Sequence, residues 1–319
     1  QVLRHGTMRA LTAGLEVVLA DGNVLDLMVP LAKDNQGPAP KEIFIGAEGT
    51  LGIITGVTIK LVPDIAARAV AWLAVETPHA ALAVLRALEP VLGGGLEGFE
   101  LIPQRALDNV VARIPGTLPP LAGDHPWHVL VELVSDNAAN APAPRLEDAL
   151  APLLETGLLQ DAAMASSEAQ AEAMWRIRDA ISEAERSIGP AIQHDVSVPV
   201  ARMPDFIAAV PPAVQAAYPG AISLPFGHLG DGNVHYHIRP PAGQDAAQWI
   251  ATHGDAASRL VYDAAVAMGG SISAEHGIGR VKRDVLAAIG DPVRIGILRA
   301  LKAALDPAGL FNPGVLIPD

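Results

Sequence analysis

The stretch from residue 227 to residue 237 reads GHLGDGNVHYH and predicts an antiparallel hairpin. Asp-Gly between apolar positions is a strong signal for a two-residue turn. With the turn at Asp231-Gly232, His228 faces His235, and the Cβ atoms of residues opposed in this way lie about 4.5–5.5 Å apart. His237 comes two residues after His235 and is expected on the same face of its strand. Two imidazoles at this spacing can share a metal ion; the alternative is a pair of packed histidines beside an ordinary hairpin.

Outward from this hairpin, strands and helices are mixed without the regular rhythm of a parallel α/β fold. Short strands are predicted at Ile222–Phe226 and Val234–Ile238, and long helices at Ser167–Ser187 and Ala246–Met268. The first of these helices has apolar residues at spacings of three and four. This mixture predicts an α+β fold in which helices cover an antiparallel sheet.

The N-terminal region has a different pattern, dominated by short strands and turns. Asp21-Gly22 between two apolar runs predicts a second hairpin. A strand at Ile43–Ile45, a glycine-rich loop and a strand at Leu51–Leu61 are expected to follow. Pro63-Asp64 ends this region, which places a domain boundary near residue 65.

A carboxylate and a further histidine adjoin in the segment Ser271–Arg280, SISAEHGIGR. Small residues and glycines around Glu275 and His276 are typical of a tight loop at a ligand. Glu275 can complete a set of two histidines and one carboxylate, which binds divalent metals and leaves coordination positions open. His276 would then suit a general base, since histidine titrates near neutral pH. The alternative is an exposed Glu-His pair in a loop that ends a helix.

Arg178 and Ser182 are one turn apart on the predicted helix and flank its apolar stripe. Because a guanidinium can hold a carboxylate with two hydrogen bonds, the pair is a candidate anchor for an acidic substrate. The alternative is a surface ion pair between Arg178 and either Asp179 or Glu185.

The run Gly46–Thr55, GAEGTLGIIT, contains three glycines that would let the backbone approach a ligand closely. Its spacing matches neither the phosphate-binding loop of nucleotide hydrolases nor the dinucleotide-binding fingerprint. A purely structural turn is the alternative.

The composition excludes several classes of protein. A formal net charge of −13 argues against nucleic-acid binding, which requires clustered lysine and arginine. The absence of cysteine excludes disulfides, iron–sulfur clusters and thiolate metal sites, so a metal would need histidine and carboxylate ligands. No apolar run is long enough to cross a membrane, and no secretion signal is recognisable. A cytoplasmic protein, or one bound peripherally at the inner membrane, is expected.

Together these segments resemble the FAD-linked oxidases of the vanillyl-alcohol-oxidase (PCMH) type. The resemblance is to the branch that contains D-lactate dehydrogenase, D-2-hydroxyglutarate dehydrogenase and the flavoprotein subunit of glycolate oxidase. The motifs occur in the family's order and cover nearly the whole chain. They are RHGTMR (Arg4–Arg9), GLEVVLADG (Gly14–Gly22), IFIGAEGTLGIIT (Ile43–Thr55), WRIRDAIS (Trp175–Ser182), HDVSVP (His194–Pro199), HLGDGNVH (His228–His235), SISAEHGIG (Ser271–Gly279) and LDPAGLFNPG (Leu305–Gly314).

The resemblance implies that residues 1–65 end a PCMH-type FAD-binding domain and that residues 66–319 form an FAD-linked oxidase C-terminal domain, which caps the substrate. It implies FAD as cofactor, together with a divalent metal, zinc in preference to manganese or iron. The implied roles are metal ligation by His228, His235 and Glu275, proton abstraction by His276, substrate binding by Arg178, Ser182, Gln193 and His237, and flavin contacts by Glu48, Gly49, Gly52, Ile53, Ile54 and Asn312.

The implied reaction is the oxidation of a small D-2-hydroxy acid to the 2-oxo acid. The substrate hydroxyl is expected on the metal and the carboxylate on Arg178, while His276 takes the hydroxyl proton and a hydride passes to flavin N5. The expected electron acceptor is a quinone, a cytochrome or an electron-transfer flavoprotein, and a homodimer is one expected assembly.

Three departures from the family pattern bear on function. The N-terminal flavin-phosphate loop of the family is absent, which predicts that this chain is part of a longer protein. Gln193 stands where relatives commonly carry lysine, and His237 where many carry asparagine. Because a buried second carboxylate needs a charged partner, monocarboxylic acids such as D-lactate or glycolate are expected to be better substrates than D-2-hydroxyglutarate.

Two other functions remain open from the residues alone. A metal-dependent hydrolase could use the same two histidines and glutamate to activate water, and it would be active without flavin. A non-catalytic fragment that lacks the flavin-phosphate loop is the second.

Overall fold

The structure is a computed structural model that describes residues 2–31 and 33–318 and divides the chain into two compact units. The larger unit holds residues 2–4 and 63–274 of the described chain, and the smaller unit holds residues 5–62 and 275–318. The smaller unit is therefore built from both ends of the chain. The assignment of residues 1–65 to a flavin domain and of residues 66–319 to a substrate domain stays a proposal.

The larger unit is organised around one antiparallel sheet of seven strands in the order β7-β4-β6-β5-β9-β10-β8. The strands are β4 (Ala67–Val75), β5 (Leu96–Pro103), β6 (Trp127–Ser135), β7 (Asp161–Met164), β8 (Ile192–Ser197), β9 (Ile222–His228) and β10 (Asn233–Arg239). Every pairing is antiparallel, which confirms the predicted α+β fold.

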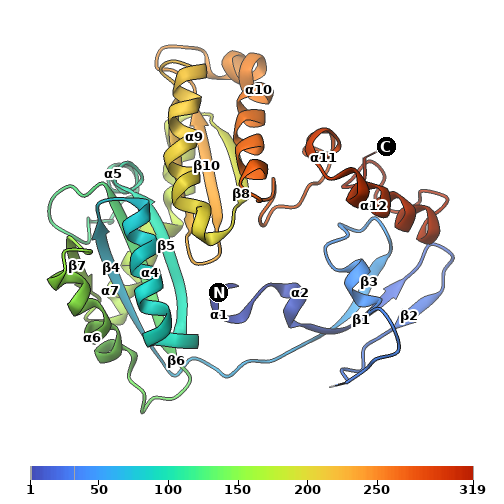
Figure 1. The fold of residues 1–319 in the computed structure, drawn as a ribbon, viewed down its shortest axis with the longest axis horizontal. Coiled ribbons are helices and arrows are strands. Elements are labelled where there is room, and N and C mark those ends of the chain that lie inside the picture. Colours follow the sequence, from blue (N-terminus) through green and yellow to red (C-terminus); the bar gives the residue numbers. More distant parts are fainter. Residues whose placement is uncertain (1, 32, 319) are drawn as a thin grey trace. The chain divides into compact units, whose positions relative to one another are not determined.

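Helices cover both faces of this sheet (Figure 1). One face carries α4 (Pro78–Leu92), α6 (Pro142–Glu155), α9 (Met203–Ala217) and α10 (Ala246–Ala267), and the other carries α5 (Gln104–Arg113), α7 (Glu168–Asp179) and α8 (Ile181–Ile188). Beneath α5, α7 and α8 the buried core includes Trp72, Leu130 and Phe226 from the sheet. Among the described residues, no helix is both long enough and apolar enough to span a bilayer.

The single helix predicted from Ser167 to Ser187 is in fact two helices. Helix α7 ends at Asp179 and α8 begins at Ile181, with Ala180 between them at φ −78° and ψ −5°. A ψ near 0° interrupts the α-helical hydrogen-bond ladder. The apolar stripe continues across the break, so the spacing of apolar residues could not reveal it.

The smaller unit contains a three-stranded antiparallel sheet in the order β2-β1-β3. The strands are β1 (Thr12–Val18), β2 (Val24–Asp26) and β3 (Ile53–Ile59), and β1 with β2 confirms the hairpin predicted at Asp21-Gly22. Its core packs side chains of β1 against α12 (Pro292–Leu305). Short helices and 3₁₀ turns complete the two units: α1 (Val2–His5), α2 (Met8–Leu11), α11 (Arg283–Ile289), η1 (Gly93–Gly95) and η2 (Val200–Arg202).

The strand predicted at Ile43–Ile45 is wrong, because the chain forms a short helix, α3 (Lys41–Phe44). Phe44 is buried in the core of the smaller unit, together with Leu15 and Val17. A short apolar run does not distinguish a strand from a buried helical turn, and packing decided here.

A buried histidine in β6, His128, contacts side chains of β4 and α5 in the larger unit. Trp72 Nε1 donates a hydrogen bond to His128 Nδ1 (3.0 Å), and His128 Nε2 lies 2.7 Å from Gln104 Oε1. Because the indole nitrogen can only donate, Nδ1 accepts, and the imidazole proton belongs on Nε2. His128 is 1% exposed, and burial, assisted by nearby His125, lowers its pKa to about 4.

We expect the stability of the protein to fall between pH 6.5 and pH 4 through His128. The folded state keeps this imidazole neutral, whereas the unfolded chain binds a proton below the ordinary pKa of 6.5. The stabilisation is therefore complete above pH 6.5 and is lost as the pH falls toward 4. Lowering the pH from 7 to 5 should cost about 2 kcal/mol of unfolding free energy through this group. Denaturant titrations at pH 7 and pH 5 should show that His128→Gln loses less unfolding free energy than the wild type does. Equal losses in the two proteins would contradict the role given to His128.

Candidate functional site

The hairpin β9–β10 carries both predicted histidine ligands, but in a register different from the predicted one. Asn233 pairs with His228, and His235 pairs with Phe226. The turn therefore comprises four residues, 229–232, and the prediction that His228 directly faces His235 is wrong by two positions. The carboxylate of Asp231 accepts the N–H of Asn233 (3.1 Å), which closes this longer turn.

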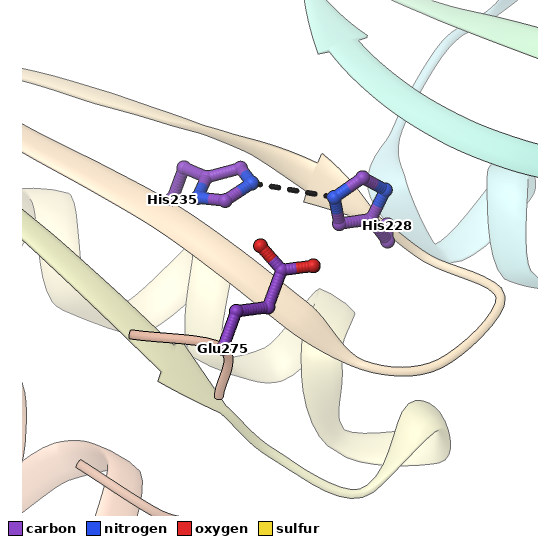
Figure 2. A group of neighbouring side chains, drawn as sticks. All are labelled: His228, His235 and Glu275. Carbon is purple, nitrogen blue, oxygen red and sulfur yellow. Dashed lines mark hydrogen bonds between the residues drawn. The ribbon is translucent and has the colours of Figure 1, made fainter. Parts of the chain in front are cut away.

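The faces of the strands are nevertheless as predicted, because a shift of two residues keeps each side chain on its side of the sheet. The Nε2 atoms of His228 and His235 lie 3.4 Å apart (Figure 2). The ring of Phe226 contacts both His235 and His237, with its centroid 5.2 Å from that of each imidazole. Two of the three histidines therefore converge, and the third, His237, packs against the phenyl ring.

Each of the two converging imidazoles has a buried carboxylate behind its Nδ1 atom. Glu100 Oε1 lies 2.7 Å from His228 Nδ1, and Asp195 Oδ1 lies 3.9 Å from His235 Nδ1. Glu100 is within hydrogen-bond distance of His228 Nδ1, Asp195 is at ion-pair distance from His235 Nδ1, and the two Nε2 atoms are directed at each other. This is the arrangement of two histidines that bind one ion through Nε2.

Glu275 adjoins this pair. It follows Ala274, the last residue of the larger unit, whose N–H is donated to the carbonyl of Asp195 (3.3 Å). The ligand atoms of His228, His235 and Glu275 all lie within 4.8 Å of one another (Figure 2). Two imidazole nitrogens and one carboxylate oxygen are a donor set for zinc, manganese or iron, so the residues present fit a divalent metal.

The two histidines differ in their electrostatic surroundings. Burial and the nearby Arg178 lower the pKa of His235 to about 4, so this imidazole is neutral at pH 7. Burial also acts to lower the pKa of His228, but the hydrogen bond and the charge of Glu100 outweigh it and raise that pKa. Because a metal binds only the neutral imidazole, metal and proton compete at His228 more than at His235.

Arg178 is buried, with 8% of its surface exposed, and points at the same site. Its Nε donates to Glu100 Oε2 (2.7 Å), and its Nη2 donates to His228 Nε2 (3.3 Å). A surface ion pair with Asp179 or Glu185, the alternative suggested by the sequence, is therefore wrong. The guanidinium lies beside the two histidines, where it could hold an anionic ligand.

Glu100 is the site residue that sequence reasoning missed. It lies in β5, whose eight residues are all buried, and its pKa is lowered to about 2. Burial acts to raise this pKa, but Arg178 and His228 outweigh burial. Two acids, Glu97 and Glu100, in an otherwise apolar strand (LEGFELIP) were the available signal, since a buried charge needs a partner.

The remaining predicted substrate residues lie in α8, β8 and β10. Ser182 is half-buried in the first turn of α8, and Gln193 is exposed in β8, where it pairs in register with His237. His237 is 4% exposed, and its Nδ1 has no hydrogen-bond partner among the described residues. Burial lowers the pKa of His237 to about 4, so it brings no positive charge at neutral pH. The predicted base, His276, is exposed and directly follows Glu275.

The residues predicted to line a flavin lie in the smaller unit. Glu48, at φ +51°, accepts the N–H groups of Ile278 and Gly279 through its carboxylate, both at 2.7 Å. Asn312 donates its side-chain N–H to the carbonyl of Glu48 (2.5 Å). These bonds join the glycine-rich loop, which contains Gly49 and Gly52, to the segment that follows His276. Ile53 and Ile54, also predicted to contact the flavin, are exposed on β3.

Comparison with known proteins finds relatives by sequence, among them two D-2-hydroxyglutarate dehydrogenases. A D-2-hydroxyglutarate dehydrogenase of Xanthomonas citri pv. viticola is 36% identical over 316 residues, which cover 99% of this chain and 65% of that protein. The mitochondrial D-2-hydroxyglutarate dehydrogenase of Rattus norvegicus is 35% identical over 316 residues, covering 99% of this chain and 57% of that protein. The chain thus spans less than two thirds of the length of either relative.

Among solved structures, p-cresol methylhydroxylase with bound substrate is similar to this chain with a TM-score of 0.70. The similarity covers 100% of this chain and 68% of that one at 15% identity, so it speaks for a shared fold alone. The sequence matches a family over residues 65–316, and that family is described as FAD linked oxidases, C-terminal domain. Since this match takes in β4 to α12, including both histidines, Glu275 and Arg178, the chain belongs to the family of FAD-linked oxidases with this C-terminal domain.

Proposed function

We propose that the protein carrying this chain oxidises a small D-2-hydroxy acid to the corresponding 2-oxo acid, with FAD and a divalent metal as cofactors. The observation that carries the proposal is the placement of Arg178 beside His228 and His235, in a chain of an FAD-linked oxidase family. When bound, FAD would accept a hydride, and the metal would hold the substrate hydroxyl and lower its pKa. The names of the two relatives support a D-2-hydroxy acid as substrate.

The spacing of the anchor suits this class of substrate. In a 2-hydroxy acid the hydroxyl and the carboxylate are on adjacent carbons, so the group that binds the carboxylate must lie next to the group that binds the hydroxyl. Arg178 Nη2 lies 3.3 Å from His228 Nε2, which meets this condition. Ser182 would add a hydrogen bond to the carboxylate, and His276 would take the hydroxyl proton.

The smaller unit would contribute to flavin binding. Glu48, Gly49, Gly52, Ile53, Ile54 and Asn312 are proposed to line the flavin, with Glu48 acting through its backbone because its carboxylate binds Ile278 and Gly279. The proposed electron acceptor is a quinone, a cytochrome or an electron-transfer flavoprotein, and the proposed assembly is a homodimer. A cytoplasmic location, free or at the inner membrane, completes the proposal.

A monocarboxylic substrate is the proposed preference within this class. Gln193 and His237, which face each other across β8 and β10, are both neutral at pH 7. Nearby Arg239 forms an ion pair with buried Glu185, which neutralises its charge. D-2-hydroxyglutarate is the second candidate, and the names of the two relatives favour it.

The protein purified from its native host should oxidise D-lactate or glycolate in preference to D-2-hydroxyglutarate in a dye-linked assay. In Gln193→Lys, kcat/KM for D-2-hydroxyglutarate should rise about tenfold, since one charge-assisted hydrogen bond contributes roughly 1.5 kcal/mol. A wild-type preference for D-2-hydroxyglutarate would overturn the substrate preference alone. Activity that needs the metal but no flavin, on esters or amides, would replace the proposed function with a hydrolase.

A further inference from the structure

Glu100 makes two short contacts from the centre of the sheet, and the proposed reaction so far gives it no role. In β5 it pairs in register with His228 of β9. One carboxylate oxygen lies 2.7 Å from His228 Nδ1, and the other accepts the Nε hydrogen of Arg178 at 2.7 Å. Glu100 is 4% exposed, so both contacts are shielded from water.

We propose that Glu100 is a positioning residue that holds His228 and Arg178 in place together, one as a metal ligand through Nε2 and the other as the anchor for the substrate carboxylate. The inference rests on the metal centre proposed above. A single side chain, Glu100, would thus position both His228 and Arg178, which must act on adjacent atoms of the same substrate.

The chemistry of the carboxylate supports this role. When Nδ1 of His228 donates its hydrogen to Glu100, the lone pair of the neutral ring is on Nε2, which points at His235. A carboxylate offers two acceptor oxygens, and here each oxygen has a different donor. An amide in the same place has a single acceptor oxygen, so it could satisfy only one of the two donors.

Stability alone is a weaker explanation for this buried charge. Burying an ion pair costs desolvation, and apolar residues of similar size often serve folding as well or better. A second buried acid on a neighbouring strand, Glu132 of β6, provides a comparison, because it pairs only loosely with Arg68 (3.5 Å) and burial raises its pKa. Glu132 is therefore a buried glutamate of the same sheet whose arginine contact is longer than either contact of Glu100.

The test is Co²⁺ binding to the full chain, followed by the visible spectrum of the bound ion, without any assay of activity. Glu100→Gln should weaken Co²⁺ binding by about 10–100-fold, the usual effect of removing the carboxylate partner of a ligating histidine. Arg178→Gln breaks the same buried ion pair but leaves both oxygens of Glu100 to His228, so its Co²⁺ affinity should equal or exceed that of the wild type. Glu132→Gln, the matched buried glutamate, should bind Co²⁺ as the wild type does.

The comparison of the variants separates positioning from loss of stability. Equal Co²⁺ affinity in the wild type and Glu100→Gln would overturn the inference, as would equal weakening in Glu100→Gln and Arg178→Gln. If Glu100→Gln does not fold, Glu100→Asp replaces it, because aspartate keeps the charge but is shorter by one methylene. Glu100→Asp should also weaken Co²⁺ binding. Wild-type Co²⁺ affinity in Glu100→Asp would overturn the inference. Wild-type protein that binds Co²⁺ no better than His228→Ala would instead refute the metal centre itself.

Discussion

His228→Ala and His235→Ala are each expected to remove the bound metal and to lower turnover of a D-2-hydroxy acid by at least about 10³-fold, which corresponds to about 4 kcal/mol of transition-state stabilisation. The physical reason is that the two Nε2 atoms, 3.4 Å apart, are proposed to bind one ion, and either nitrogen alone would leave it with too few ligands. Metal content by elemental analysis and steady-state kinetics measure the two losses.

Each variant should keep the fold, because both side chains are only partly buried and the hairpin is held by its backbone pairing. His253→Ala, a half-buried histidine of α10, is the matched control and should keep both metal and turnover. Stoichiometric metal in either site variant would sink the proposed centre.

Arg178→Lys should lower kcat/KM for a D-2-hydroxy acid by about 100-fold, mostly through a higher KM. Lysine keeps the charge but cannot donate to Glu100 through Nε and at the same time present a planar edge to the substrate carboxylate. Loss of one or two charge-assisted hydrogen bonds, at roughly 1.5–3 kcal/mol each, accounts for an effect of this size.

The control for this change is on the same helix. Arg176 of α7 is exposed, and its guanidinium donates to the carbonyl of Pro115, so Arg176→Lys should leave the kinetics unchanged. If the two variants lost activity equally, or if Arg178→Lys had a wild-type KM, Arg178 would not be the anchor of the carboxylate.

The sequence by itself was enough to place His228 and His235 on one face of a hairpin. That prediction tolerated an error of two positions in the register, because side chains alternate with a period of two along a strand. The antiparallel sheet covered by helices likewise followed from local patterns of apolar residues and turns.

The tertiary structure alone decided which groups meet the histidines. Glu100 is 78 residues before Arg178 and 128 before His228, and no local spacing connects strands and helices at such separations. The break at Ala180 and the helical turn that buries Phe44 were also decided by packing, since the apolar pattern is compatible with either local structure. The same holds for Glu48, whose carboxylate binds backbone amides 230 and 231 residues away. Periodicity reports which face a side chain takes, whereas the partner that it meets there depends on how the strands and helices assemble.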